Sequence, residues 1–84
     1  MQINLFKDAI VWSKHNCPAC DAVKDLLTKN NYHIDARSID DAKGMMDLMK
    51  NVPGAKSVPQ VMIGGKYIGG LQQVREYLNR KWLL

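Results

Sequence analysis

Two cysteines, Cys17 and Cys20, lie three positions apart, and Pro18 follows the first of them. The apolar segment Ala9–Ser13 precedes the pair and predicts a buried strand, and proline suits the first position of a helix. Cys17 would then lie at a helix N-terminus, where unpaired backbone N–H groups and the helix dipole favour a thiolate, and Lys14 could add positive charge. A thiolate attacks disulfides, and Cys20, about one turn into the helix, is placed to attack the resulting mixed disulfide. The spacing therefore predicts thiol–disulfide exchange.

Three other roles for the cysteine pair remain as alternatives. A structural disulfide between cysteines so close in sequence closes almost no loop and would stabilise the fold little. A zinc site needs two more ligands, but His15 is awkwardly close to the pair and His33 is expected to begin or flank a strand. The third alternative is two inert buried cysteines. A close pair without further cysteines is typical of a reducing compartment, so we expect a cytoplasmic protein with no bound metal.

The composition is ordinary for a folded domain, and we expect a single domain over residues 1–84. The net charge is +4, but the basic residues are scattered without a run, so we expect no nucleic-acid partner. Met1–Trp12 lacks the features of a signal peptide, and no apolar run is long enough to cross a membrane. We therefore expect no membrane partner, and we expect a monomer.

Hydrophobic periodicity predicts alternating strands and helices along the chain. The predicted strands are Ile10–Trp12 with a start as early as Ile3, Tyr32–Ile39, Pro59–Ile63 and Lys66–Ile68. The predicted helices are Pro18–Asn30, a second one capped by Asp40 or Asp41 and stopped by Val52-Pro53-Gly54, and a last one striped by Leu71, Val74, Leu78 and Trp82. The first two strands should be parallel, and the last two, joined by the Gly64-Gly65 turn, antiparallel. This order predicts an α/β fold, a mixed four-stranded sheet with helices on both faces.

The second predicted helix carries an apolar stripe at helical spacing. The stripe consists of Ala42, Met45, Met46 and Met49. Thioether sulfurs could bind a metal, but methionine fills irregular gaps in cores and a single stripe accounts for all three, so we expect these side chains to pack in the core. Gly44 lowers the helix propensity of the same segment.

Three segments resemble those of glutaredoxins, in the order and at the spacing found in that family. The first is Trp12–Cys20, with an aromatic residue, a small hydroxyl residue, a lysine, two variable residues and then Cys-Pro-x-Cys. The second is Ser57–Ile63, which begins with the Thr/Ser-Val-Pro block, and the third is Ile68–Gly70. A lone Cys-x-x-Cys would be a weak signal, whereas the three segments together indicate a glutaredoxin-like chain.

The resemblance implies a thioredoxin fold in which the Val58-Pro59 peptide bond is cis and faces the active site. Val58 would pair its backbone with the cysteine of bound glutathione, and Lys14 would meet a glutathione carboxylate. The N-terminus of the last helix would lie by the γ-glutamyl end, where backbone N–H groups suit a carboxylate. The implied groove consists of Lys14, Ser57, Val58, Pro59, Gly70, Leu71 and Gln72.

Two positions depart from the usual glutaredoxin pattern. Ala19 stands where many glutaredoxins carry tyrosine, which opens the rim of the site. Gln72 stands where the family often has Asp or Ser, so hydrogen-bonding capacity is kept and an acidic partner for the glutathione ammonium is lost.

The resemblance implies a dithiol enzyme in which Cys17 attacks a protein disulfide or a glutathione mixed disulfide and Cys20 resolves the intermediate. Glutathione would be the co-substrate that reduces the enzyme, and ribonucleotide reductase would be an electron acceptor, as for many glutaredoxins. One alternative is a thioredoxin-like redoxin recharged by an NADPH-dependent flavoprotein reductase. Another is a protein that binds an iron–sulfur cluster through Cys17 of two subunits and two glutathiones.

Overall fold

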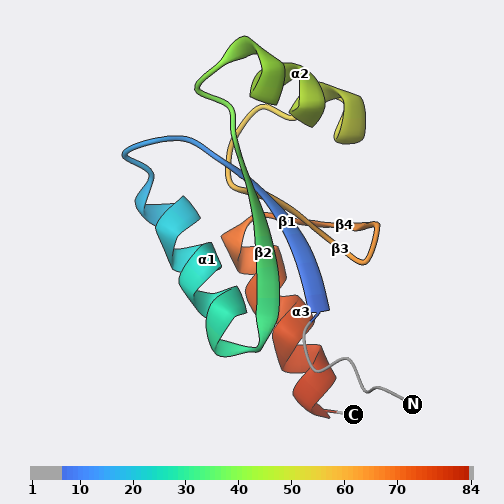
Figure 1. The fold of residues 1–84 in the computed structure, drawn as a ribbon. Helices are drawn as coiled ribbons and strands as arrows, with labels where there is room; N and C mark the ends of the chain where they lie inside the picture. Colours follow the sequence, from blue (N-terminus) through green and yellow to red (C-terminus); the bar gives the residue numbers. More distant parts are fainter. Residues whose placement is uncertain (1–6, 84) are drawn as a thin grey trace, which may run out of the picture.

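The structure is a computed structural model that describes residues 7–83, with side chains to residue 80. Its elements follow the predicted order (Figure 1): β1 Lys7–Ser13, α1 Pro18–Lys29, β2 Tyr32–Ser38, α2 Ala42–Asn51, β3 Gln60–Ile63, β4 Lys66–Gly69 and α3 Leu71–Leu83. The predicted early start of the first strand at Ile3 and the side chain of Trp82 lie outside the described part. Within residues 7–83, no helix is both long and apolar enough to span a membrane.

The sheet has the strand order β2-β1-β3-β4, with β1 parallel to β2 and the β3–β4 pair antiparallel, as predicted. Gly64 and Gly65 form the predicted tight turn and both have positive φ angles, which glycine adopts without strain. Trp12 at the end of β1 pairs with Gln60 at the start of β3, and Val61 pairs with Gly69 at the end of β4. This register brings the loop after β1, the loop before β3 and the start of α3 to the same end of the sheet.

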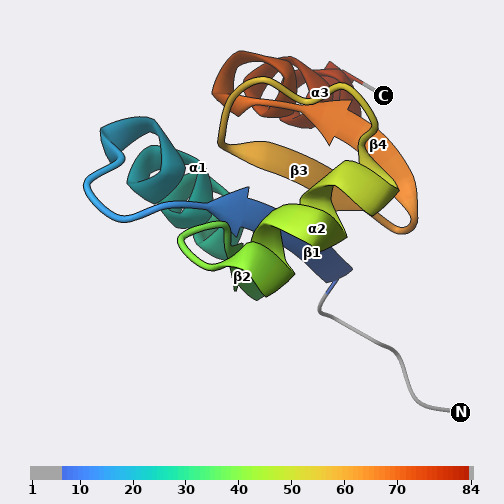
Figure 2. The ribbon, with the colours of Figure 1, turned by 90° about the horizontal axis from the view of Figure 1, so that it is seen from above.

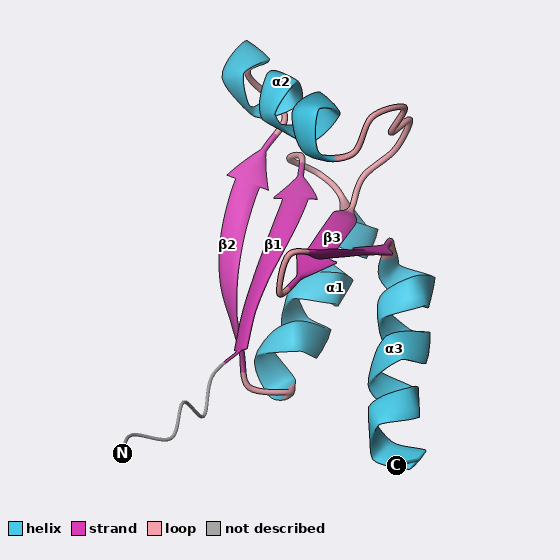
Figure 3. Ribbon diagram, turned by 90° about the vertical axis from the view of Figure 1, so that its right-hand side faces the viewer, coloured by secondary structure: helices cyan, strands magenta, loops and turns pink. Residues whose placement is uncertain are grey.

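One face of the sheet is covered by α1 and α3, which lie side by side along the strands (Figures 1 and 3). The buried apolar side chains between these layers form the core: Ala9, Val11, Val23, Leu27, Tyr32, Val61, Ile63, Val74 and Leu78. The alternation of side chains along a strand directs Ala9 and Val11 to this face. Burial of this set fixes α1, and with it both cysteines, against the sheet.

The other face carries α2, which crosses only the end where β1 and β2 finish (Figures 2 and 3). Gly44 lies against the backbone of Ser38 at the end of β2, and Leu48 is the buried apolar residue of the helix. Asp47 is directed at β1 and β2, where it accepts hydrogen bonds from Trp12 and Arg37.

The predicted core position of the methionine stripe is wrong. Met45 and Met49 are each 42% exposed and Met46 is 71% exposed. The side of α2 that faces the sheet carries Gly44, Asp47 and Leu48, so the methionines are turned away from it. Hydrophobic spacing identified a stripe, but a close backbone approach and polar hydrogen bonds determine which side of the helix meets the sheet.

Candidate active site

The cysteine pair lies at the start of α1, as predicted. Cys17 is the N-cap residue, Pro18 occupies the first turn, and a disulfide joins Cys17 to Cys20 with a Cα–Cα distance of 5.2 Å. The Cys20 backbone N–H donates to Cys17 Sγ at 3.1 Å. Cys17 is 7% exposed and Cys20 is fully buried, so Cys17 is the more accessible of the two residues. The hydrogen bond and the helix N-terminus both favour a thiolate on Cys17 in the reduced protein.

The loop between β1 and Cys17 is tied to the loop after β2 by Asp40. The Asp40 carboxylate accepts from the His15 backbone N–H at 3.0 Å, and His15 Nδ1 lies 2.9 Å from its other oxygen. Ser38 Oγ donates to the same carboxylate at 2.9 Å. Hydrogen bonds from His15 and then from Ser38 lower the pKa of Asp40. Asp40 therefore fixes the loop that leads into Cys17, while Asp41 is the cap of α2.

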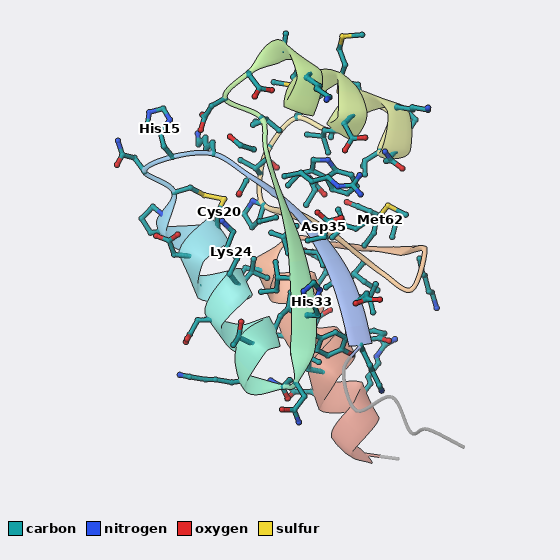
Figure 4. The ribbon with its side chains drawn as sticks, viewed as in Figure 1. His15, Cys20, Lys24, His33, Asp35 and Met62 are labelled. Atoms are coloured by element: carbon teal, nitrogen blue, oxygen red, sulfur yellow. A yellow bond between two sulfur atoms is a disulfide. The ribbon has the colours of Figure 1, made fainter. Side chains whose placement is uncertain are left out.

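The two histidines do not join the cysteines. Figure 4 shows His15 at the tip of its loop, turned away from the disulfide. His33 lies on β2, where its Nδ1 is 3.6 Å from an Asp8 oxygen. Within residues 7–83, no three His, Cys, Asp or Glu side chains are grouped as metal ligands.

The Val58-Pro59 peptide bond is cis, as predicted, and directly precedes β3. A cavity of about 170 Å³ places Lys14 together with Ser57 and Val58, three of the predicted groove residues. Its remaining lining is Ile39, Met45, Leu48, Ala55 and Lys56. Two lysines thus flank an apolar recess beside the predicted substrate-binding loop, and Lys56 was not among the predicted site residues. The larger hollow of about 610 Å³ beside α2 contains none of them.

The start of α3 lies against the same loop. A Cβ added to Gly70 would lie 3.4 Å from the Pro59 carbonyl oxygen, so the chain passes close to that loop at this glycine. The Gly70 carbonyl accepts from Val74 N–H, and the Gly70 N–H donates to Gln73 Oε1 at 3.0 Å. Gly70 is thus the cap residue and Gln73 occupies the third helical position, as in a capping box. The backbone N–H groups of the next two residues belong to the first helical turn, which has no acceptor within its own helix.

Gln72 is exposed at the predicted position beside this helix start. Ala19, the other departure from the family pattern, is half-buried. The structure therefore brings the loop before the cysteine pair, the Val58-Pro59 loop and the start of α3 to the same end of the sheet.

Trp12 is the next-to-last residue of β1, shortly before the loop that leads into Cys17, and it is fully buried. Its indole N–H donates to Asp47 at 2.9 Å, Arg37 donates to the same oxygen at 2.8 Å, and the guanidinium lies 5.7 Å from the Trp12 ring centroid. The hydrogen bond from Arg37, followed by that from Trp12, lowers the pKa of Asp47. These polar contacts hold α2 on the sheet, and hydrophobic periodicity contains no signal for them.

A family model for glutaredoxin matches residues 9–68. A glutaredoxin from Vernicia fordii is 36% identical over 64 residues, covering 73% of this chain and 62% of that protein. The chain spans 50 to 62% of the length of the three curated relatives from V. fordii, Oryza sativa and Solanum lycopersicum.

Solved structures show the same arrangement of elements. Glutaredoxin 1 from Francisella tularensis, complexed with cacodylate, has a TM-score of 0.74 at 22% identity, covering 93% of this chain and 99% of that one. A buckwheat glutaredoxin–glutathione complex has a TM-score of 0.74 at 29% identity, covering 89% and 71% of the two chains. The mixed sheet with α1 and α3 on one face and α2 on the other is the thioredoxin fold. With its Cys-Pro-x-Cys pair at the start of α1 and a family match over most of its length, the chain belongs to the glutaredoxin family, whose members are thiol–disulfide oxidoreductases.

Proposed function

We propose that this protein is a glutathione-linked dithiol oxidoreductase that reduces protein disulfides and glutathione mixed disulfides. The Cys17 thiolate attacks one sulfur of the substrate disulfide, and the other substrate sulfur leaves as a thiolate. The Cys20 thiolate then attacks Cys17 Sγ, so the Cys17–Cys20 disulfide forms and the second substrate sulfur leaves. Two electrons pass to the substrate, and the protein is left with the Cys17–Cys20 disulfide that the structure contains.

The observation that carries this proposal is the placement of the cysteine pair. Cys17 caps α1 at the end of the sheet where the Val58-Pro59 loop and the start of α3 also lie. This arrangement suits the disulfide of a peptide that carries a carboxylate. The helix N-terminus at Cys17 favours the nucleophilic thiolate, the loop offers backbone groups to the peptide, and the N-terminus of α3 suits the carboxylate. The Val58 N–H and carbonyl would pair with the backbone of the substrate cysteine.

Glutathione is the proposed reductant. One glutathione thiolate attacks the oxidised protein and forms a mixed disulfide with Cys17, which releases Cys20, and a second yields oxidised glutathione and frees Cys17. A buckwheat relative forms a complex with glutathione, which supports this assignment. Lys14 in the cavity beside Val58, and the backbone N–H groups in the first turn of α3, would bind the two glutathione carboxylates. We propose ribonucleotide reductase as one protein acceptor and the cytoplasm as the compartment.

The test is a coupled assay in which the consumption of NADPH is followed with a small glutathione mixed disulfide as substrate. We expect turnover with glutathione and glutathione reductase, none with thioredoxin reductase in their place, and none for Cys17→Ser. Turnover supported only by thioredoxin reductase would identify a redoxin of the thioredoxin-like kind instead. A visible absorbance band in protein purified without oxygen would favour the cluster-binding alternative.

A further inference from the structure

Gln60 is a buried polar residue that directly follows Pro59. Its side chain is bonded on both sides: Nε2 lies 3.0 Å from the Ser57 carbonyl oxygen, and Oε1 lies 2.7 Å from the Tyr67 hydroxyl. Gln60 is 8% exposed and Tyr67 is 51% exposed. These two bonds form the Gln60 hydrogen-bond chain, which runs from Tyr67 on β4 through Gln60 on β3 to the loop that precedes β3.

The chemistry of the groups fixes the direction of this chain. A carbonyl oxygen only accepts hydrogen bonds, so the Gln60 amide must present its N–H group to Ser57. The Gln60 carbonyl oxygen then faces Tyr67, and the tyrosine hydroxyl has to donate. Tyr67 thereby holds the amide in the orientation that serves Ser57.

The Ser57 carbonyl belongs to the same peptide group as the Val58 N–H. This peptide bond is trans, because Val58-Pro59 is the cis bond of the described chain. In a planar trans peptide the C=O and N–H bonds point in opposite directions. By holding the Ser57 carbonyl, Gln60 directs the Val58 N–H away from itself, and Val58 lines the cavity shared with Lys14.

A hollow of about 540 Å³ adjoins the Gln60 hydrogen-bond chain. Residues 51–56, at the end of α2 and in the loop that follows it, line this hollow together with Gln60 and Tyr67. The Gln60 side chain therefore reaches the Ser57 carbonyl from β3, and its hydrogen bond helps to set the plane of the Ser57–Val58 peptide.

We propose that Gln60 and Tyr67 are positioning residues that aim the Val58 N–H at the backbone of the cysteine in a peptide disulfide. The inference rests on the proposed function. It adds that the oriented Val58 N–H makes the protein react faster with disulfides of peptides than with disulfides that have no peptide backbone. Neither residue touches the reacting sulfurs, so the reactivity of Cys17 itself should be unaffected.

The experiment compares two disulfides that differ in having a peptide backbone. Reduced protein is mixed with oxidised glutathione or with bis(2-hydroxyethyl) disulfide, and the rate of thiol loss is measured by acid quench and mass spectrometry. The readout is the ratio of the two rate constants. We expect Gln60→Glu to lower this ratio about tenfold, because its carboxylate cannot donate to Ser57, and Tyr67→Phe to lower it about threefold. Tyr77→Phe is the matched control, since its hydroxyl contacts Tyr32 at the opposite end of the sheet.

The outcomes separate this inference from the proposed function. If the wild type reacts with both disulfides and the ratio of the two rate constants is unchanged in Tyr67→Phe and Gln60→Glu, the positioning role alone is overturned. Equal losses of both rates in the variants would also overturn it, since they would indicate general support of the fold. A wild-type protein inert toward both disulfides would remove the proposed function and this inference with it. Tyr67→Phe deletes one hydroxyl from a half-exposed ring, so it remains informative even where Gln60→Glu does not fold.

Discussion

Replacing Gly44 by alanine tests how closely α2 approaches β2. Helix propensity alone predicts that Gly44→Ala stabilises the protein by up to about 1 kcal/mol, because glycine is a poor helix former. The structure predicts the opposite sign. A Cβ at this position would lie 1.6 Å from the Ser38 carbonyl oxygen and 2.8 Å from its carbon, and both are backbone atoms that cannot rotate away.

The magnitude follows from the movement that the methyl group requires. Ordinary Cβ contacts begin at 3.4 Å, so the two backbones would have to separate by roughly 1.8 Å. The bonds from Arg37 and Trp12 to Asp47, at 2.8 and 2.9 Å, could not stretch by that amount and survive. Overpacking costs about 1–3 kcal/mol. We expect the upper end of this range here, because the new methyl group meets backbone atoms of Ser38, which cannot move aside as a flexible side chain could. After the gain in propensity, the net loss is about 2 kcal/mol, or a fall in Tm of roughly 8–16 °C.

The assay is urea and thermal unfolding of the oxidised protein, followed by tryptophan fluorescence. Lys43→Ala is the control, because Lys43 is the adjacent exposed helix residue and its replacement should change stability by less than about 0.5 kcal/mol. If Gly44→Ala equals or exceeds the wild type in stability while Lys43→Ala behaves as expected, the close approach of α2 to β2 is wrong.

Three further predictions concern the cysteines and the charges of α2. In the reduced protein, limiting iodoacetamide at near-neutral pH should label Cys17 before Cys20, because Cys17 is the N-cap of α1 and the more exposed of the two residues. Mass spectrometry measures the label, and preferential label on Cys20 would contradict this. Cys20→Ser should keep turnover of small glutathione mixed disulfides and lose reduction of protein disulfides, and inactivity in both assays would refute this division of roles. Hydrogen bonds from Arg37 and Trp12 lower the pKa of Asp47 in the folded protein. The ionised carboxylate therefore adds to the free energy of unfolding above the pKa of Asp in the unfolded chain, about 3.9, and this stabilisation is lost as the pH falls through the lower pKa of the folded state. The difference in unfolding free energy between the wild type and Asp47→Asn, measured in urea, should therefore be present at neutral pH and vanish at acid pH. A difference that does not depend on pH would show that the charge of Asp47 does not contribute. Asp25→Asn is the control, because Asp25 forms an exposed i,i+4 ion pair with Lys29.

Much of the framework could be read from local patterns in the sequence. A strand followed by Pro18 in the first helical turn places Cys17 at a helix N-terminus, and the Gly64-Gly65 pair predicts a tight hairpin. Alternating and helical spacings also predicted the order of the elements, and the connections between strands predicted which strands are parallel. These features depend on residues close together in the chain, and backbone preferences and hydrophobic periodicity act at that range.

The tertiary structure alone decided how α2 sits and what supports the active-site loops. The bond from Trp12 to Asp47 joins residues 35 positions apart, and the contact of His15 with Asp40 spans 25. Such polar contacts leave no periodic signal, because each needs only one donor and one acceptor brought together by the fold. The prediction that the methionines face the core was therefore wrong. Apolar spacing identifies a stripe on a helix, but it does not include the hydrogen bonds of Asp47 to the sheet or the close approach of Gly44 to the Ser38 backbone. Sequence patterns could place the cysteines at a helix end, but the Val58-Pro59 loop and the start of α3 reach the same end of the sheet only because segments distant in the sequence meet there.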